Sequence, residues 1–572
     1  MKWNLFFSAT LLSLTCFAQK PKITWGDEFK LKKGSTDLEV IYADKNGVFL
    51  QEGHLAMKSY FLIGASSRSS ATLVKLDRSL VEVYRNDYNS ELKGKEFIQF
   101  YVLQDKLFVI ATDYEKKEKT LTLFGAEVDK NSGNLKGDWV QVTSFQKEEK
   151  ADMINLKITL NSDSSNMVIV STIAGKARNE YAIQEFDKNL KASSRPINIS
   201  NEFDPQTFQL EDVLYTINKK VVLVGRIYEF QEGKKKKSKF LEFSNYNIRL
   251  YDDKGKKEKE INTNVNGKWL SSTKLIQEKD KDIVLAAFYS NQRKGKVIDG
   301  MLVQRINPVT GEVISTSEKV INHSLLSGDT DEPGDDIDES ESKAERRERE
   351  KLDKIKDEGE AFSKFMQFRN ILYTKNGELV IVAEKYHHYI HTTQHFSPGV
   401  NGSPGTWTTR SYSVYECGDI LMCKIDNAGN IGWMQILPKA QREVIPTGNY
   451  YSGFTHSAFF DASSRPFYAG FAVLQVNNEI QLLFNDNPKN AVVTQAGQKV
   501  KTTSRFAKSH CYLVSVDAST GKMQRKMFFT NSDIPTSMPR LGSVIGEEMY
   551  IVGKEDRFLG KSKVAVAKIT MK

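Results

Sequence analysis

Short apolar segments separated by polar turns recur along the whole chain. One kind of turn joins two apolar-rich strands through a few polar residues, as in "VIYADKNGVFL" (40–50). Asn-Gly between alternating apolar residues, which occurs twice, is the strongest short-range signal for a β-hairpin. The pattern predicts eight hairpins, at 40–50, 101–111, 158–170, 214–225, 275–287, 372–383, 458–473 and 543–553.

A second kind of turn follows each of the first seven hairpins. It places Asp or Asn after a strand, then small polar residues and often Gly, before another strand begins. An Asp or Asn side chain can bond backbone groups two residues later, and Gly accepts a positive φ. Seven such turns are predicted, starting at Asp77, Asp129, Asp187, Asp252, Asn307, Asp426 and Asp517.

The eighth unit is one strand short. Its hairpin is followed by "KVAVAKITMK" (563–572), and the chain then stops. Before the first unit, "KITWGDEFKL" (22–31) predicts a strand that belongs to no hairpin. Together the two chain ends supply one complete four-stranded unit, as the closure of a ring requires.

These four-stranded units resemble those of the β-propeller superfamily, broadly the PQQ-like and WD40-like repeats. The segment "DNAGNIGWMQIL" (426–437) comes closest to a family-type repeat, but no motif identifies a subfamily. The resemblance implies an all-β fold over residues 19–572, a propeller of eight four-stranded blades with the N-terminal strand closing the last blade. Seven blades, two smaller propellers and other all-β folds such as β-sandwiches remain alternatives.

An insertion interrupts the repeats between the fifth and sixth units. Residues 323–363 begin with the acidic run "GDTDEPGDDIDESE" (328–341), and "SKAERREREKLDKIKDEGEAF" follows with charges of alternating sign. Opposite charges three or four positions apart support a helix in water. The pattern predicts an acidic, solvated loop plus a charged helix, which could also serve as an arm for docking a partner. The acidic run lacks the ligand set of a calcium loop.

The N-terminus has the pattern of a secretory signal. One Lys precedes an apolar run in "MKWNLFFSATLLSLTCFA" (1–18), and the ending "FAQ" resembles those of exported Bacteroidota proteins. Cleavage after Ala18 is favoured over acylation of Cys16, because Thr15 precedes that cysteine where lipoprotein signals carry a smaller residue. No later run is long enough for a transmembrane helix. The chain is therefore expected in the periplasm, at the outer membrane or outside the cell.

Basic residues gather in the turns that join the second and third strands of the units. The formal charge is only +9 over 572 residues, so its distribution matters more than its total. In an up-and-down blade these turns lie at one end, which predicts a basic rim that attracts anions. An exported protein rarely meets nucleic acid as its proper ligand. The rim includes Lys234, Lys235, Lys236, Lys237, Arg293 and Lys294.

A projecting hairpin over 385–418 is predicted to carry a histidine and aromatic ridge, and a second long loop is expected over 474–509. Four of the eight histidines lie in "EKYHHYIHTTQHF" (384–396). On a strand, residues four apart are roughly 13 Å from each other, too far to share one metal ion. We therefore expect no metal site but a surface for carbohydrate or protein contact. Its residues are His387, Tyr389, His391, His395 and, on the opposite arm, Trp407.

No sequence motif identifies a reaction. The chain lacks a nucleophile elbow, a phosphate-binding loop, a dinucleotide fingerprint and zinc-ligand spacing. Cys417, Cys423 and Cys511 are interpreted as small buried apolar residues. The sequence favours a non-catalytic binding or scaffold protein of the cell envelope, without cofactor, whose partner is an anionic glycan, a lipid headgroup or a protein. The alternative is an exported hydrolase that acts on glycans in the propeller channel.

Overall fold

The computed structural model describes most of the chain after residue 21. It covers residues 22–31, 35–60, 64–149, 151–161, 164–175, 179–200, 207–232, 239–263, 268–277, 282–291, 298–321, 366–374, 376–397, 406–447, 466–533, 535–555 and 563–570. The predicted signal (1–18) and the predicted acidic and helical insertion (323–363) lie outside the described residues.

In the N-terminal half, consecutive strands form four antiparallel sheets of four strands each. The first holds β3 (Ser35–Asp44), β4 (Gly47–Tyr60), β5 (Gly64–Leu76) and β6 (Glu82–Asp87). The second holds β7 (Glu96–Leu103), β8 (Lys106–Glu115), β9 (Thr120–Val128) and β10 (Val140–Gln146). The third holds β11 (Met153–Leu160), β12 (Met167–Ala174), β13 (Asn179–Phe186) and β14 (Ile197–Ser200). The fourth holds β15 (Phe208–Tyr215), β16 (Val221–Glu232), β17 (Lys239–Tyr251) and β18 (Lys257–Thr263).

The C-terminal half of the described chain forms four further sheets. The fifth holds β19 (Trp269–Gln277), β20 (Ile283–Ser290), β21 (Gly300–Ile306) and β22 (Val313–Val320). The sixth holds β23 (Met366–Tyr373), β24 (Leu379–Ser397), β25 (Thr406–Ile425), β26 (Ile431–Leu437) and β27 (Gln441–Thr447). The seventh holds β28 (Ala472–Val476), β29 (Glu479–Asp486), β30 (His510–Asp517) and β31 (Met523–Thr530). The last holds β32 (Thr536–Ile545), β33 (Glu548–Glu555), β34 (Lys563–Thr570), β1 (Lys22–Trp25) and β2 (Phe29–Lys30).

The two chain ends meet in the last sheet. Strand β1 pairs with β34, so that Lys22 faces Thr570 and Trp25 faces Ala567. Gly553 of β33 lies under the Trp25 ring, where a Cβ atom would come within 2.9 Å of it. The strand that the sequence left without a hairpin thus supplies the strand that the last unit lacked.

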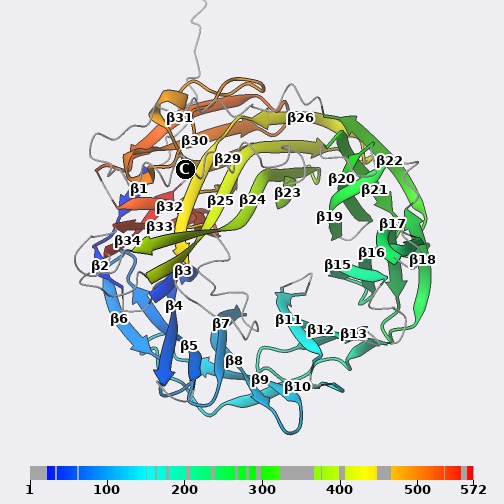
Figure 1. The fold of residues 1–572 in the computed structure, drawn as a ribbon, viewed down its shortest axis with the longest axis horizontal. Coiled ribbons are helices and arrows are strands. Elements are labelled where there is room, and N and C mark those ends of the chain that lie inside the picture. Colours follow the sequence, from blue (N-terminus) through cyan, green and yellow to red (C-terminus); the bar gives the residue numbers. More distant parts are fainter. Residues whose placement is uncertain are drawn as a thin grey trace, which may run out of the picture.

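Apolar side chains hold neighbouring sheets together around the ring. Among the described residues, eight clusters each join two successive sheets, and the cluster of Leu50 and Val566 joins the last sheet to the first. Figure 1 shows the resulting ring, with β3, β7, β11, β15 and β19 nearest its centre. Burial between sheets explains why the second strand of a sheet, such as β20, is apolar at nearly every position. The arrangement is consistent with the predicted β-propeller.

The Asp and Asn turns have the predicted geometry. The Asp77 carboxylate accepts hydrogen bonds from the backbone nitrogens of Ser79 and Val81 at 2.8 and 2.9 Å. In the same way, each of the other six side chains accepts a bond from the backbone nitrogen two residues later. These turns are confirmed as local, structural uses of Asp and Asn.

The seventh sheet corrects one predicted hairpin. We expected its first turn within 458–473, but β28 and β29 are joined at Asn477 and Asn478, and Asn477 has a φ of 53°. Residues 458–465 lie outside the described part of the chain. Because β29 fills 479–486, the long loop of this sheet spans 487–509 rather than 474–509. Asn tolerates the left-handed conformation that so short a turn needs.

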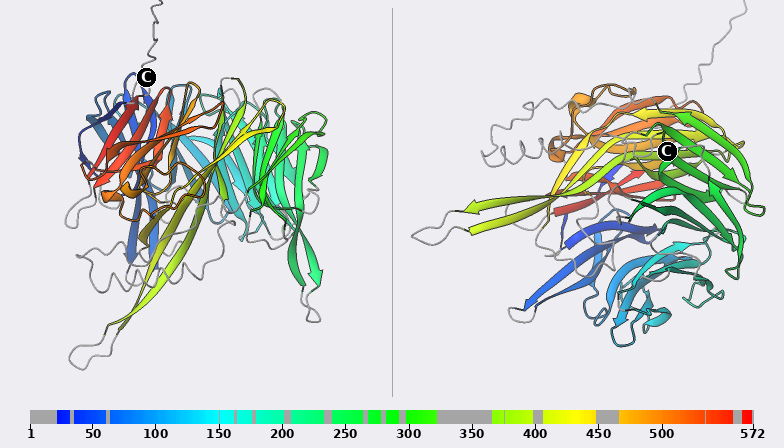
Figure 2. Two further views of the ribbon diagram at one scale, coloured as in Figure 1. Left: turned by 90° about the horizontal axis from the view of Figure 1, so that it is seen from above. Right: turned by 45° about the vertical axis from the view of Figure 1, so that its right-hand side comes forward.

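The hairpin of β24 and β25 is the longest pair of strands in the described chain. It runs from Leu379 opposite Ile425 to Ser397 opposite Thr406. Both views in Figure 2 show it extending beyond the ring. Among the described residues, the helices are the two short 3-10 turns Pro488–Asn490 and Phe506–Lys508, and none is long and apolar enough to cross a membrane.

Candidate functional site

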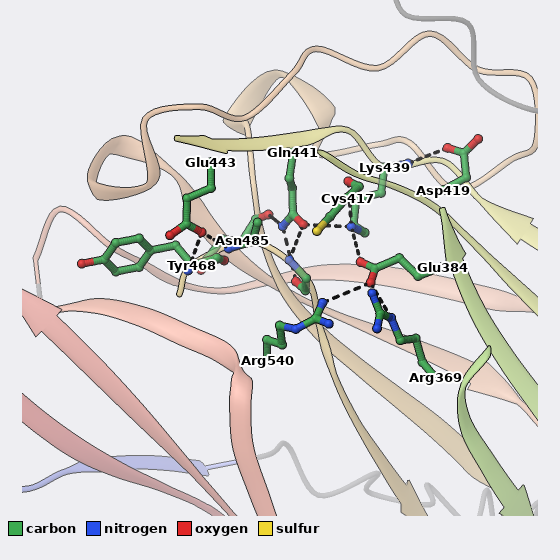
Figure 3. Close-up of polar contacts among 12 residues, drawn as sticks. Arg369, Glu384, Cys417, Asp419, Lys439, Gln441, Glu443, Tyr468, Asn485 and Arg540 are labelled. Carbon is green, nitrogen blue, oxygen red and sulfur yellow. Dashed lines mark hydrogen bonds and ion pairs between the residues drawn. The ribbon is translucent and has the colours of Figure 1, made fainter. Parts of the chain in front are cut away.

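A fully buried carboxylate, Glu384, lies at the centre of a charged cluster on the inner side of the ring. It follows the buried run 379–383 of β24 and has no exposed surface. Three cations contact it: Lys439 Nζ at 2.9 Å, Arg369 Nε at 3.0 Å and Arg540 Nη1 at 3.3 Å (Figure 3). They come from the segment before β27, from β23 and from β32, so the cluster depends on the folded ring.

Lys439 is the structural cation of this cluster. Its side chain is fully buried, and Nζ donates to Glu384, to the Cys417 carbonyl at 3.0 Å and to Gln441 Oε1 at 2.8 Å. These three bonds satisfy all the donors of an ammonium group. Its backbone nitrogen donates to Asp419 Oδ1 at 3.0 Å, which fixes the chain where it turns back to pair β27 with β25. Lys439 therefore has no donor left for a ligand.

The two arginines are held differently. Each guanidinium lies over the Tyr386 ring, at 4.3 Å for Arg369 and 5.0 Å for Arg540, which is a cation–π distance. Their side chains are 19% and 17% exposed, unlike that of Lys439. Arg369 Nη2 is buried without a hydrogen-bond partner among the described residues. The pair thus keeps donor capacity that Glu384 does not use.

The charges of the cluster do not balance. Burial raises the pKa of Glu384, but the charges of Lys439, Arg369 and Arg540 outweigh it and hold that pKa below its ordinary value. Burial lowers the pKa of Arg369, Glu384 opposes this, and the like charge of Arg540 adds to it. Arginine nonetheless stays protonated in proteins. Among the ion pairs that Glu384 itself makes, three cations face one carboxylate, which leaves two positive charges in excess.

This excess charge borders a cavity of about 590 Å³. Arg369, Arg540 and Glu384 line it together with residues of β28 and with Gly542 and Gly546. Its size lies within the ~300–1,000 Å³ range of small-molecule sites. Glu384 stays ionised here, so it can accept hydrogen bonds but cannot serve as a proton donor near neutral pH. The arrangement suits binding of an anionic group by the two arginines.

The predicted histidine ridge is described in part. His387 Nδ1 lies 3.5 Å from Glu416 Oε2, and its ring centre is 5.0 Å from that of Tyr389. The neighbouring His388 instead stacks on Tyr415 at 4.3 Å. His391 pairs with Tyr412 across the hairpin. Within the described ranges, no three His, Cys, Asp or Glu residues are placed to hold a metal ion.

The other predicted contact residues are not described as side chains. His395 and Trp407 lie in β24 and β25, but only their backbone positions are described. The basic residues Lys234, Lys235, Lys236, Lys237, Arg293 and Lys294 lie outside the described residues. The basic rim therefore stays a prediction.

The three cysteines of the described chain are buried and free, as predicted. Burial raises the pKa of the Cys417 thiol to about 12, and the Glu384 charge adds to this. Burial likewise raises the pKa of the Cys423 thiol to about 12. A thiol that stays protonated is a poor nucleophile, so Cys417 and Cys423 are packing residues.

Sequence reasoning missed the Glu384 cluster. One signal was present, because a charged residue directly follows the apolar run 379–383 within the same strand. Nothing in the sequence paired that carboxylate with Lys439 or Arg540, which lie 55 and 156 positions further along the chain. The predicted contact residues were instead the histidines that follow Glu384 in the same strand.

Comparison with known proteins gives distant structural likenesses only. No family model matches, and no curated protein sequence matches. The polysaccharide lyase Uly1 has a TM-score of 0.32 at 10% identity, covering 83% of this chain and 89% of its own. The β-propeller domain of the Trilobed protease from Pyrococcus furiosus has a TM-score of 0.29 at 9% identity, covering 86% and 97%. A puromycin-hydrolyzing peptidase from Mycobacterium tuberculosis has a TM-score of 0.34 at 8% identity, covering 92% and 61%. Likenesses this weak say nothing about the ligand or the activity of this chain.

Proposed function

We propose that this chain is an eight-bladed β-propeller that binds an anionic ligand in the cavity beside Glu384, on the inner side of the ring. Eight sheets joined in a cycle by apolar clusters support the blade number, and the PQQ-like and WD40-like resemblance of the repeats agrees with it. The observation that carries the binding function is the excess of two positive charges around Glu384 at a cavity wall.

The charge and the volume of this cavity restrict the class of ligand that can bind. A carboxylate or phosphate group matches the planar donors of Arg369 and Arg540, and a site of about 590 Å³ admits a sugar or a headgroup. An anionic glycan is therefore favoured over a folded protein partner at this site. The basic rim and the His387–Tyr389 ridge are proposed as outer contacts for the same partner.

We further propose that the protein lies in the cell envelope and has no catalytic activity. The signal pattern of residues 1–18 supports export. Fractionation of cells that express the tagged full chain tests this, since a cytoplasmic, uncleaved product contradicts it. A glycan hydrolase remains the alternative, because propeller channels can hold paired carboxylates. Release of new reducing ends from an acidic polysaccharide by the purified protein would establish that alternative.

Calorimetric titration with glucuronate tests the binding function. We expect binding that weakens by at least about tenfold in Arg540→Gln, because one of two charge-assisted donors is lost. Neutral glucose should not bind measurably. The matched control is Arg78→Gln, since Arg78 pairs with Glu548 at 2.9 Å on the surface and is 42% exposed. No binding of glucuronate, or equal losses in the two variants, would contradict the proposal.

A further inference from the structure

A second cavity adjoins the first along β32. It has a volume of about 700 Å³ and is lined by residues of the last, first and second sheets and by Leu160 of the third. Val544 lies in the wall of both cavities. The inner side of the ring therefore offers two neighbouring binding volumes, each within the ~300–1,000 Å³ range of small-molecule sites.

The polar groups of the second cavity are unlike those of the first. Glu39, Gln51, Gln99 and Tyr101 line it, and none of them forms an ion pair among the described residues. Tyr101 Oη is buried and has no hydrogen-bond partner in the described chain. Gln51 Oε1 accepts from the Phe100 nitrogen at 2.8 Å, which fixes the amide and directs its NH2 group away from that bond. A buried hydroxyl without a partner is costly unless a ligand or water satisfies it.

Glu39 adds a carboxyl group to the wall of the same cavity. Burial raises its pKa, and no cation offsets that effect. The Glu39 carboxyl accepts hydrogen bonds, the Tyr101 hydroxyl both donates and accepts them, and each amide offers a donor and an acceptor separately. Such groups match the hydroxyls of a neutral sugar, not an anion. The apolar Val102 and Val544 in the same walls suit the C–H faces of a sugar ring.

We propose that the two cavities form one site for a mixed acidic glycan. A uronic acid places its carboxylate at Arg369 and Arg540, and an adjoining neutral sugar binds through its hydroxyls to Tyr101, Gln99 and Glu39. This inference rests on the proposed anion binding, because the uronate carboxylate fixes where the glycan lies along the two cavities. It specifies the ligand further, as a glycan in which a charged residue neighbours an uncharged one.

The test compares three ligands by calorimetry: glucuronate, a trisaccharide of one glucuronate and two neutral xyloses, and neutral xylotriose. We expect the mixed trisaccharide to bind at least about tenfold more tightly than glucuronate, since several neutral hydrogen bonds are added. Xylotriose should bind weakly, because it lacks the anionic anchor.

Tyr101→Phe isolates the second cavity. The variant removes only a buried hydroxyl that has no partner, so the fold should be unaffected. We expect a loss of about three- to tenfold in affinity for the trisaccharide and no change for glucuronate. Arg540→Gln should weaken both.

The outcomes separate the two proposals. If glucuronate binds but the trisaccharide binds no more tightly, or Tyr101→Phe leaves the trisaccharide unaffected, the second cavity is not part of the site. If neither acidic ligand binds, the anion-binding function itself fails. Tight xylotriose binding that Tyr101→Phe abolishes would also overturn the inference, because the acidic residue would then be dispensable.

Discussion

Glu384 and Asp486 are both fully buried carboxylates, yet their surroundings differ. Asp486 accepts from Arg525 at 2.7 Å and from Thr503 and Asn490 at 2.8 Å each, so one cation balances one anion. Glu384 has three cations, two of them partly exposed to a cavity. The Arg525 side chain is 1% exposed and is enclosed by the ring faces of Tyr512 and Phe484.

The difference separates a structural ion pair from a binding site. A buried pair that is already neutral gains nothing from a further ion, and breaking it leaves an uncompensated charge. A cluster with excess positive charge at a cavity wall is stabilised when an anion binds in the cavity. The two carboxylates are equally buried, so burial does not distinguish a structural ion pair from a binding site. The balance of charge around each carboxylate does.

The largest effect is expected from breaking the balanced pair. Asp486→Asn leaves Arg525 buried without a counter-ion, which should cost roughly 3–5 kcal/mol of unfolding free energy. Urea denaturation followed by tryptophan fluorescence measures it. Added phosphate should not restore stability, because Arg525 is enclosed. A wild-type unfolding midpoint in the variant would show that Asp486 is not structurally required.

A smaller loss is expected from Glu384→Gln, because the two arginines can be solvated from the cavity and buried Lys439 keeps its bonds to the Cys417 carbonyl and to Gln441 Oε1. We expect about 2–3 kcal/mol of destabilisation, below the value for a fully enclosed pair. Phosphate or glucuronate should recover part of it, since either anion can neutralise Arg369 and Arg540. The comparison fails if anions rescue Asp486→Asn equally, or if they do not rescue Glu384→Gln.

The pH dependence of stability sharpens the contrast further. The pKa of Glu384 is lowered in the folded protein, so its stabilisation is fully present above its ordinary pKa of about 4.5 and is lost as pH falls through the lower folded value. Melting curves from neutral pH to about pH 2.5 should show the gap between wild type and Glu384→Gln shrinking below about pH 4.5. A gap that stays constant would mean that the carboxylate charge contributes nothing.

The smallest expected effect is a local change in the accessibility of two cysteine thiols. Cys417 lies beside the Glu384 cluster, and Cys511 pairs with Asn485, next to Asp486. In wild type both thiols should resist iodoacetamide, because burial raises the pKa of each. Mass spectrometry should find faster alkylation of Cys417 in Glu384→Gln and of Cys511 in Asp486→Asn. Equal acceleration of both thiols in either variant would indicate global rather than local opening.

Local pattern predicted the repeated strands and turns well because each depends on adjacent residues. The Asp77-type turns, and the assignment of the 22–31 strand to the incomplete last unit, followed from the spacing of the repeats. The hairpin predicted at 458–473 was misplaced because its polar residues outweighed the Asn477–Asn478 dipeptide, which makes the actual turn. The Glu384 cluster could not be predicted, since periodicity does not say which inner strands face one another across a ring.

The pairing of β1 with β34 also sets the order in which the molecule can be completed. Strand β1 and its partner β34 are more than 500 residues apart in the chain, so their pairing closes the ring. Until then the first sheet and the unfinished last sheet expose apolar faces, which invites association with other chains. Closing so long a loop makes this final step slow. A version lacking residues 22–25 should therefore form an open ring prone to self-association, which light scattering during refolding would reveal.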